Sequence, residues 1–117
     1  MKVVVALTLL LCSSALADIS ACRDAVSSGN GSALKECTPL AKAGNPDAQF
    51  KLGYMYYIGQ GVAQDYVQAH MWYNLAGAAG TPIGAVENRD KVAAKMTPAQ
   101  IAEAQRLARD WKPTTAK

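Results

Sequence analysis

Few residues in this chain could carry out chemistry, and they do not form a catalytic set. The chain has 117 residues with a single histidine, His70, so a zinc site built on two histidines is excluded. We expect His70 to be a surface or half-buried residue of its helix. Carboxylates such as Glu87 and Asp90 have the positions of helix-surface residues, and the loop Gly59–Val62 lacks the Lys and Ser/Thr of a phosphate-binding loop. We therefore predict no catalytic residues, no metal site, no cofactor and no enzyme activity.

The first seventeen residues have the pattern of a secretory signal peptide. Lys2 forms a short basic region, Val3–Leu11 is an apolar run, and Ala15-Leu16-Ala17 is a small-x-small cleavage site. The apolar run is far shorter than the roughly 20 residues that cross a bilayer. We expect residues 1–17 to be removed, residues 18–117 to form the mature domain, and no membrane insertion to follow. A lipoprotein box before Cys12 is a minor alternative, because Leu11 is larger than that box prefers.

Two cysteines remain after the signal peptide, Cys22 and Cys37, and an exported protein meets an oxidising environment. A strong turn signal, Ser28–Gly31, lies midway between them. Two helices folding back at this turn would bring the cysteines opposite each other. We therefore predict a structural disulfide. A redox pair or a metal site is the alternative, although the chain has no C-x-x-C motif.

Capping residues divide the mature chain into helices. Asn45-Pro46, Thr81-Pro82 and Thr97-Pro98 each place a capping side chain before a proline, which is tolerated at the first helical position. Asp65 and Thr97 each precede a Gln by three residues, the spacing of a capping box. We predict an all-α fold of antiparallel helical hairpins. The helices are expected near residues 19–28, 32–43, 46–58, 65–79, 82–95 and 98–111, with a kink or late start at Pro39.

The chain repeats itself at a spacing of 36 residues. Ala43-Gly44 recurs as Ala79-Gly80, and the segment between them holds two helical patterns separated by the loop Gly59–Val62. The two glycines of this loop supply the left-handed backbone that a tight turn requires. A repeat of this size cannot bury its apolar face alone and must stack on neighbours. We expect a partial repeat over 19–43, a full repeat over 44–80 and capping helices over 81–113.

Four motifs in the full repeat resemble the Sel-one-like repeat family, a branch of the tetratricopeptide-like α-solenoids. They are A-Q-x-x-L-G-x-M-Y over 48–56, G-Q-G-V-x-Q-D-Y over 59–66, A-x-x-W-Y over 69–73 and A-x-x-A-G over 76–80. Residues 96–113 look like the capping segment of short exported bacterial members. The residues that carry the family's structural positions are Leu52, Gly53, Tyr56, Gly59, Gly61, Val62, Asp65, Ala69, Trp72 and Ala76.

The resemblance implies a protein that binds other proteins. Members of the family generally act as adaptors or scaffolds, so we expect an interaction module that is periplasmic or secreted and binds a protein or peptide partner. The alternative is a periplasmic small-ligand binder or an enzyme, because penicillin-binding or β-lactamase-like activity is attributed to some cysteine-rich relatives. The basic residues are scattered without any run, so a nucleic-acid partner is not expected.

Phe50, Tyr54 and Tyr57 are the predicted binding residues. Their i, i+4, i+7 spacing places them on one face of a helix, whereas another face carries Ala48, Leu52, Met55 and Tyr56. Exposed aromatic side chains are good anchors for a partner peptide. The alternative is that the cysteine-linked hairpin covers this stripe, because an uncovered apolar patch is a liability.

The last predicted helix carries an apolar stripe on Ile101, Ala104, Ala108 and Trp111. We expect this helix to seal the end of the stack. The alternative is an amphipathic helix that docks on a membrane or a partner, but mixed charges and an alanine-rich face argue against a membrane.

Overall fold

The computed structural model describes residues 19–29, 31–80 and 83–114, and this part of the chain is all-helical. Helical residues 19–27 precede α2 (Ala33–Lys42), α3 (Pro46–Ile58), α4 (Tyr66–Ala78), α5 (Ala85–Ala93) and α6 (Pro98–Asp110). The predicted fold class, a short stack of helical hairpins, is confirmed. The predicted signal peptide, residues 1–17, lies outside the described residues, and the predicted repeat boundaries stay a prediction.

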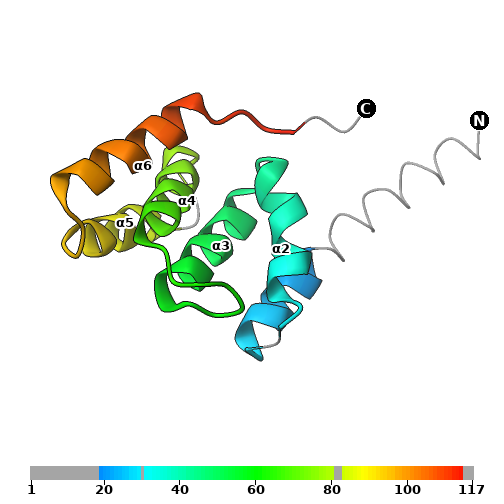
Figure 1. Cartoon of the computed structure of the whole chain (residues 1–117). Coiled ribbons are helices and arrows are strands. Elements are labelled where there is room, and N and C mark those ends of the chain that lie inside the picture. Colours follow the sequence, from blue (N-terminus) through cyan, green and yellow to red (C-terminus); the bar gives the residue numbers. More distant parts are fainter. Residues whose placement is uncertain (1–18, 30, 81–82, 115–117) are drawn as a thin grey trace, which may run out of the picture.

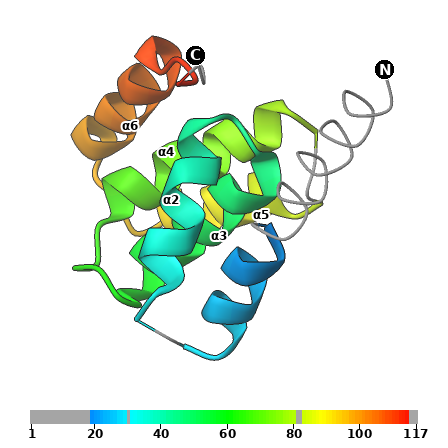
Figure 2. The ribbon, with the colours of Figure 1, turned by 90° about the vertical axis from the view of Figure 1, so that its right-hand side faces the viewer.

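Helix α4 is the centre of the stack. It packs against α3, α5 and α6, while α2 packs on α3. Figures 1 and 2 place α6 and residues 19–27 on opposite sides of the stack. Inside α4, every side chain from Ala69 to Tyr73 is buried, as is Ala76. A helix buried on all sides needs neighbours on all sides, so α5 and α6 both contact α4.

Most helix ends are those predicted by the capping residues. The Asn45 side chain accepts from the Ala48 N–H at 3.0 Å, and Thr97 and Gln100 form a full capping box. At Asp65 only half of the predicted box is present: its carboxylate accepts from the Gln68 N–H, but its own N–H donates to the Tyr56 carbonyl. That backbone bond uses the donor that the Gln68 side chain would need.

One predicted helix start was wrong, and a second feature, a late start at Pro39, is absent. Helix α5 begins at Ala85 and not at residue 82, because Gly84 precedes it with a φ of 101°, a left-handed conformation that ends the preceding turn. No side chain caps α5. Helix α2 begins at Ala33 and continues through Pro39, so the late start suggested by this proline does not occur.

The first hairpin is held by a disulfide between Cys22 and Cys37. The two Cα atoms are 4.8 Å apart and both side chains are fully buried. The other buried residues of this hairpin are the small Ala25, Ala33 and Ala41. Small side chains bury little apolar area, so the covalent link supplies stability that the core of the hairpin lacks.

Residues after α6 return to the first hairpin. The Trp111 ring lies edge-to-face with Trp72 at 6.3 Å, and the Thr114 N–H donates to the Lys42 carbonyl at 2.8 Å. On α6, Ala104 is buried and Leu107 and Ala108 pack against the core, as does Trp111 directly after the helix. This segment, residues 111–114, therefore links the last helix to α2 (Figure 1).

Removing the disulfide should destabilise the domain strongly. The double variant Cys22→Ala, Cys37→Ala is expected to lose about 3 kcal/mol of unfolding free energy, the entropic value for a loop of this length. Urea denaturation measures the loss. Dithiothreitol should destabilise the wild type and leave the variant unchanged; equal urea midpoints for the reduced and oxidised wild type would contradict a structural disulfide.

Gly53 should resist substitution, because a Cβ at this position would lie 2.9 Å from the buried Tyr73 ring. Gly53→Ala is expected to lose about 1 kcal/mol net, since overpacking outweighs the better helix propensity of alanine. Gly77→Ala is the matched control: its Cβ would meet a methyl of Val86, an exposed side chain that can rotate. Urea denaturation should rank Gly77→Ala above Gly53→Ala, and equal stability would show that Tyr73 shifts freely.

Candidate functional site

The predicted binding residues lie on a face of α3 that the first hairpin leaves open. Ala48, Leu52 and Met55, on the other face, are buried with the cysteines and alanines of the hairpin. Phe50 and Tyr57 are half-buried, and Tyr54 is 40% exposed. The hairpin therefore packs mainly against the face of α3 opposite to the aromatic stripe.

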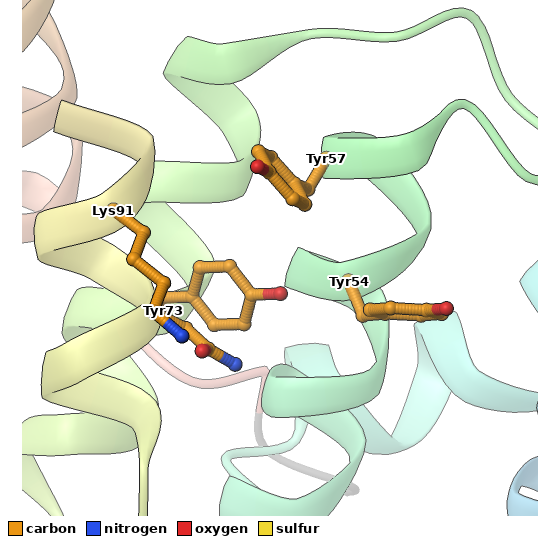
Figure 3. Close-up of a pocket in the computed structure, with 5 residues that line it drawn as sticks. Tyr54, Tyr57, Tyr73 and Lys91 are labelled. Carbon is orange, nitrogen blue, oxygen red and sulfur yellow. The ribbon is translucent and has the colours of Figure 1, made fainter. Parts of the chain in front are cut away.

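A pocket of about 250 Å³ lies between α3, α4 and α5. Its lining residues are Tyr54, Tyr57, Tyr73, Asn88 and Lys91. In Figure 3 the Tyr73 hydroxyl points toward α3, between Tyr54 and Tyr57, while Lys91 approaches from α5 on the other side.

A second pocket, of about 320 Å³, adjoins the first at Tyr54. It lies between α3 and residues 19–27, and its lining residues are Val26, Ser27, Phe50, Lys51 and Tyr54. Because Tyr54 lines both pockets, they form one surface along α3. We call the nine residues that line the two pockets the α3 groove.

Ring contacts separate the roles of the three aromatic residues. Phe50 lies edge-to-face with Tyr73 at 5.4 Å between ring centroids, and Tyr57 lies 5.9 Å from Tyr66. Both therefore contribute to a small cluster around Ala69, Tyr73 and Val92. In the described structure no ring contact of this kind involves Tyr54, so it is the residue of the stripe most available to a partner.

Tyr73 was not among the predicted site residues, although it forms the floor of the first pocket. It is 1% exposed, and burial raises its pKa, with smaller contributions in the same direction from Tyr54 and Tyr57 and an opposing one from Asn88. The phenol therefore keeps its proton at neutral pH and can donate it in a hydrogen bond. The repeat pattern offered a signal: Tyr73 lies in the W-Y pair of the motif, and its ring packs against Gly53.

Two lysine ammonium groups lie close to the aromatic rings of α3. Lys51 Nζ lies 5.8 Å from the centre of the Phe50 ring, and Lys95 Nζ lies 5.8 Å from that of Tyr57. These are cation–π distances, so each ammonium group stays at the edge of the groove. Together with Lys91, they make the rim of the groove basic.

The opposite face of α3 carries another hollow, of about 550 Å³ between α2, α3 and α4. Leu52, Tyr56 and Trp72 form its apolar wall, with Lys35 and Lys42 among the lining residues. It therefore has the same number of lining lysines as the α3 groove, on a separate surface.

His70 is buried, contrary to the prediction of a surface or half-buried residue. Its side chain is 3% exposed on α4, and its Nδ1 has no hydrogen-bond partner in the part of the chain that the structure describes. Burial lowers the pKa of His70, Arg89 lowers it further, and Asp90 opposes this. The sequence pattern of α4 does not reveal this burial, because it depends on the neighbouring helices that cover the middle of α4.

Among the described residues, His70 belongs to no metal-binding cluster. Within residues 19–29, 31–80 and 83–114, no group of three or more His, Cys, Asp or Glu side chains could hold a metal ion. Among the same residues, no helix is long and apolar enough to span a membrane.

Comparison with known families identifies the repeat. The family model described as Sel1 repeat matches residues 46–81, which include α3, the glycine loop and α4. Residues 46–81 therefore form a Sel1-like repeat. Proteins with this repeat are typically non-catalytic scaffolds that mediate protein–protein interaction. A search of curated proteins and a search of solved structures each found no match.

The buried imidazole should make stability depend on pH. Because its folded pKa lies below 6.5, the unfolded chain binds the proton more readily. The unfolding free energy should be flat above about pH 6.5 and should fall below it, by at most about 1.4 kcal/mol per pH unit. Urea denaturation between pH 5 and 8 measures this. His70→Leu should remove the slope, and an unchanged slope would assign it to other groups.

Proposed function

We propose that this protein is an exported adaptor that binds a partner protein through the α3 groove and has no catalytic activity of its own. The observation that carries the proposal is the exposed Tyr54, which lines two adjoining pockets along α3. Protein–protein interaction is the usual role of Sel1 repeats, and such repeats present their stacked helices as binding surfaces.

Export rests on the signal-peptide pattern of residues 1–17 and is supported by the disulfide. A bridge between Cys22 and Cys37 suits a protein that folds in the periplasm or outside the cell. We therefore place the adaptor in the periplasm or the secreted fraction. N-terminal sequencing of the mature protein tests this: cleavage after Ala17 is expected, and an intact N-terminus would contradict it.

The absence of catalysis is part of the proposal. His70 is buried within α4, and the polar groups of the α3 groove come from tyrosine, serine, asparagine and lysine side chains. The competing function, a β-lactamase-like enzyme, is tested by adding nitrocefin to pure protein. Clear hydrolysis would overturn the non-catalytic assignment.

A bound partner should lie against Tyr54. A photo-crosslinking amino acid at position 54 in the exported protein should give a discrete crosslinked partner, identified by mass spectrometry. Ile58 is the matched control, because it is 45% exposed on the same helix but lies outside the groove. Crosslinking from position 58 and not from 54, or from neither, would contradict the proposed surface.

A complementary pair of substitutions separates binding from folding. Tyr54→Ser should reduce capture of the partner and leave the melting temperature nearly unchanged, since Tyr54 is exposed. Tyr57→Ser should lower the melting temperature as well, because Tyr57 packs against Tyr66; a core aromatic contact is worth about 1 kcal/mol beyond its buried area. If Tyr54→Ser lowers the melting temperature as strongly as Tyr57→Ser does, Tyr54 has a structural role and the proposed binding role is wrong.

A further inference from the structure

The charged residues that line the α3 groove are both cations. Lys51 lines the pocket beside residues 19–27, and Lys91 lines the pocket beside α5. Lys95 adds a third cation over the Tyr57 ring. No carboxylate is among the lining residues of either pocket. The formal charge of the lining residues is therefore positive.

Three arginines of the described structure have internal partners. Arg23 pairs with Asp47 at 2.7 Å, Arg89 with Asp90 at 3.1 Å, and Arg106 with Glu103 at 2.7 Å. The order of Glu87 and Lys91 favours an i, i+4 pair, but within the described residues no ion pair within 4.0 Å involves Lys51, Lys91 or Lys95. Among the described residues, the cations of the groove thus have no counter-ion within 4.0 Å, and the same holds for Lys35 and Lys42 of the hollow on the opposite face.

Hydrogen-bond donors accompany the ammonium groups. The Tyr73 hydroxyl, the Asn88 amide and the Lys91 ammonium group all belong to one pocket, and each can donate to a carboxylate oxygen. Tyr73 remains protonated at neutral pH for the reason given above. A carboxylate in this pocket would receive charge-assisted hydrogen bonds, which are stronger than neutral ones.

The shape of the groove sets the length of what it can hold. From Phe50 to Tyr57 is about 10 Å along α3, given a rise of about 1.5 Å per residue. An extended chain advances about 3.3 Å per residue, so the groove spans about three residues of an extended peptide. Alternate side chains of such a peptide would meet the aromatic rings and the lysines in turn.

We propose that the α3 groove binds an acidic, extended segment of the partner protein, with a carboxylate against Tyr73, Asn88 and Lys91 and apolar side chains against Phe50 and Tyr54. This inference rests on the proposed function and adds the chemistry of the partner. The charge complementarity of the groove carries it: unpaired cations on an aromatic surface favour carboxylates that alternate with apolar groups.

Fluorescently labelled peptides of about eight residues, long enough to cover the groove in extended form, test the proposal. One peptide alternates Glu with Phe and Leu, and its control carries Gln in place of Glu. The Glu peptide should bind at least about tenfold more tightly at low salt, and the difference should shrink as salt screens the charges. Equal binding of the two peptides, or no binding of either, would overturn the proposal.

Charge reversal locates the site. The double variant Lys51→Glu, Lys91→Glu should weaken binding of the Glu peptide by at least about tenfold. Lys35→Glu, Lys42→Glu is the matched control, because both lysines line the hollow on the other face of α3, and it should bind within about twofold of the wild type. Circular dichroism checks that both variants fold. If the control pair loses binding and the groove pair does not, the placement is wrong.

The same substitutions distinguish this inference from the proposed function. Crosslinking from position 54 to a partner is repeated in the Lys51→Glu, Lys91→Glu background, where we expect it to be lost. If a partner crosslinks equally well in that background, the groove binds proteins but not through acidic groups, and only the present inference fails. If the crosslinked species is a nucleic acid or a lipid, the partner class is wrong and both fail.

Discussion

The structure depends on the enclosure of α4. Five consecutive side chains, Ala69 to Tyr73, are buried, and five residues turn through more than a full helical turn, so the middle of α4 is covered on every side. One hairpin partner, α3, covers only part of this surface. Helices α5 and α6 cover the rest, which explains why a chain with one matched repeat still needs a helical pair after it.

The enclosure also produces the groove. Tyr73 leaves α4 between α3 and α5 and fills the space that Gly53 provides, where a Cβ would approach the ring to 2.9 Å. Its ring packs edge-to-face against Phe50, while the disulfide-linked hairpin covers the opposite face of α3. The aromatic surface is therefore a consequence of packing: the side of α3 that α4 and the hairpin do not use is the side that carries Tyr54.

Signals between residues close in sequence predicted much of this fold. Features that depend on contacts between distant segments were not predicted. The caps at Asn45 and Thr97 and the left-handed Gly59 depend on residues close in sequence, so the pattern alone was sufficient. The start of α5 was misplaced because Thr81-Pro82 and Gly84 are both valid helix-start signals and only packing on α4 selects between them. The burial of His70 was missed for the same reason, since a polar side chain on an enclosed helix looks like a surface residue until its neighbours are known. The stripe on α3 followed from periodicity, but its partners Tyr73, Asn88 and Lys91 come from other helices.

A groove that spans about three residues of a peptide cannot reach the roughly 800 Å² per partner of a standard stable interface. Affinity at such a surface must come from lowering the cost of binding, and two features of the chain do this. The disulfide holds residues 19–27, whose Val26 and Ser27 line one pocket of the groove, against α2, so this wall of the groove is restrained before a partner arrives. The unpaired lysines speed the encounter with a carboxylate through charge. The basic groove and the disulfide thus both compensate for the small binding area of a stack built around one matched repeat.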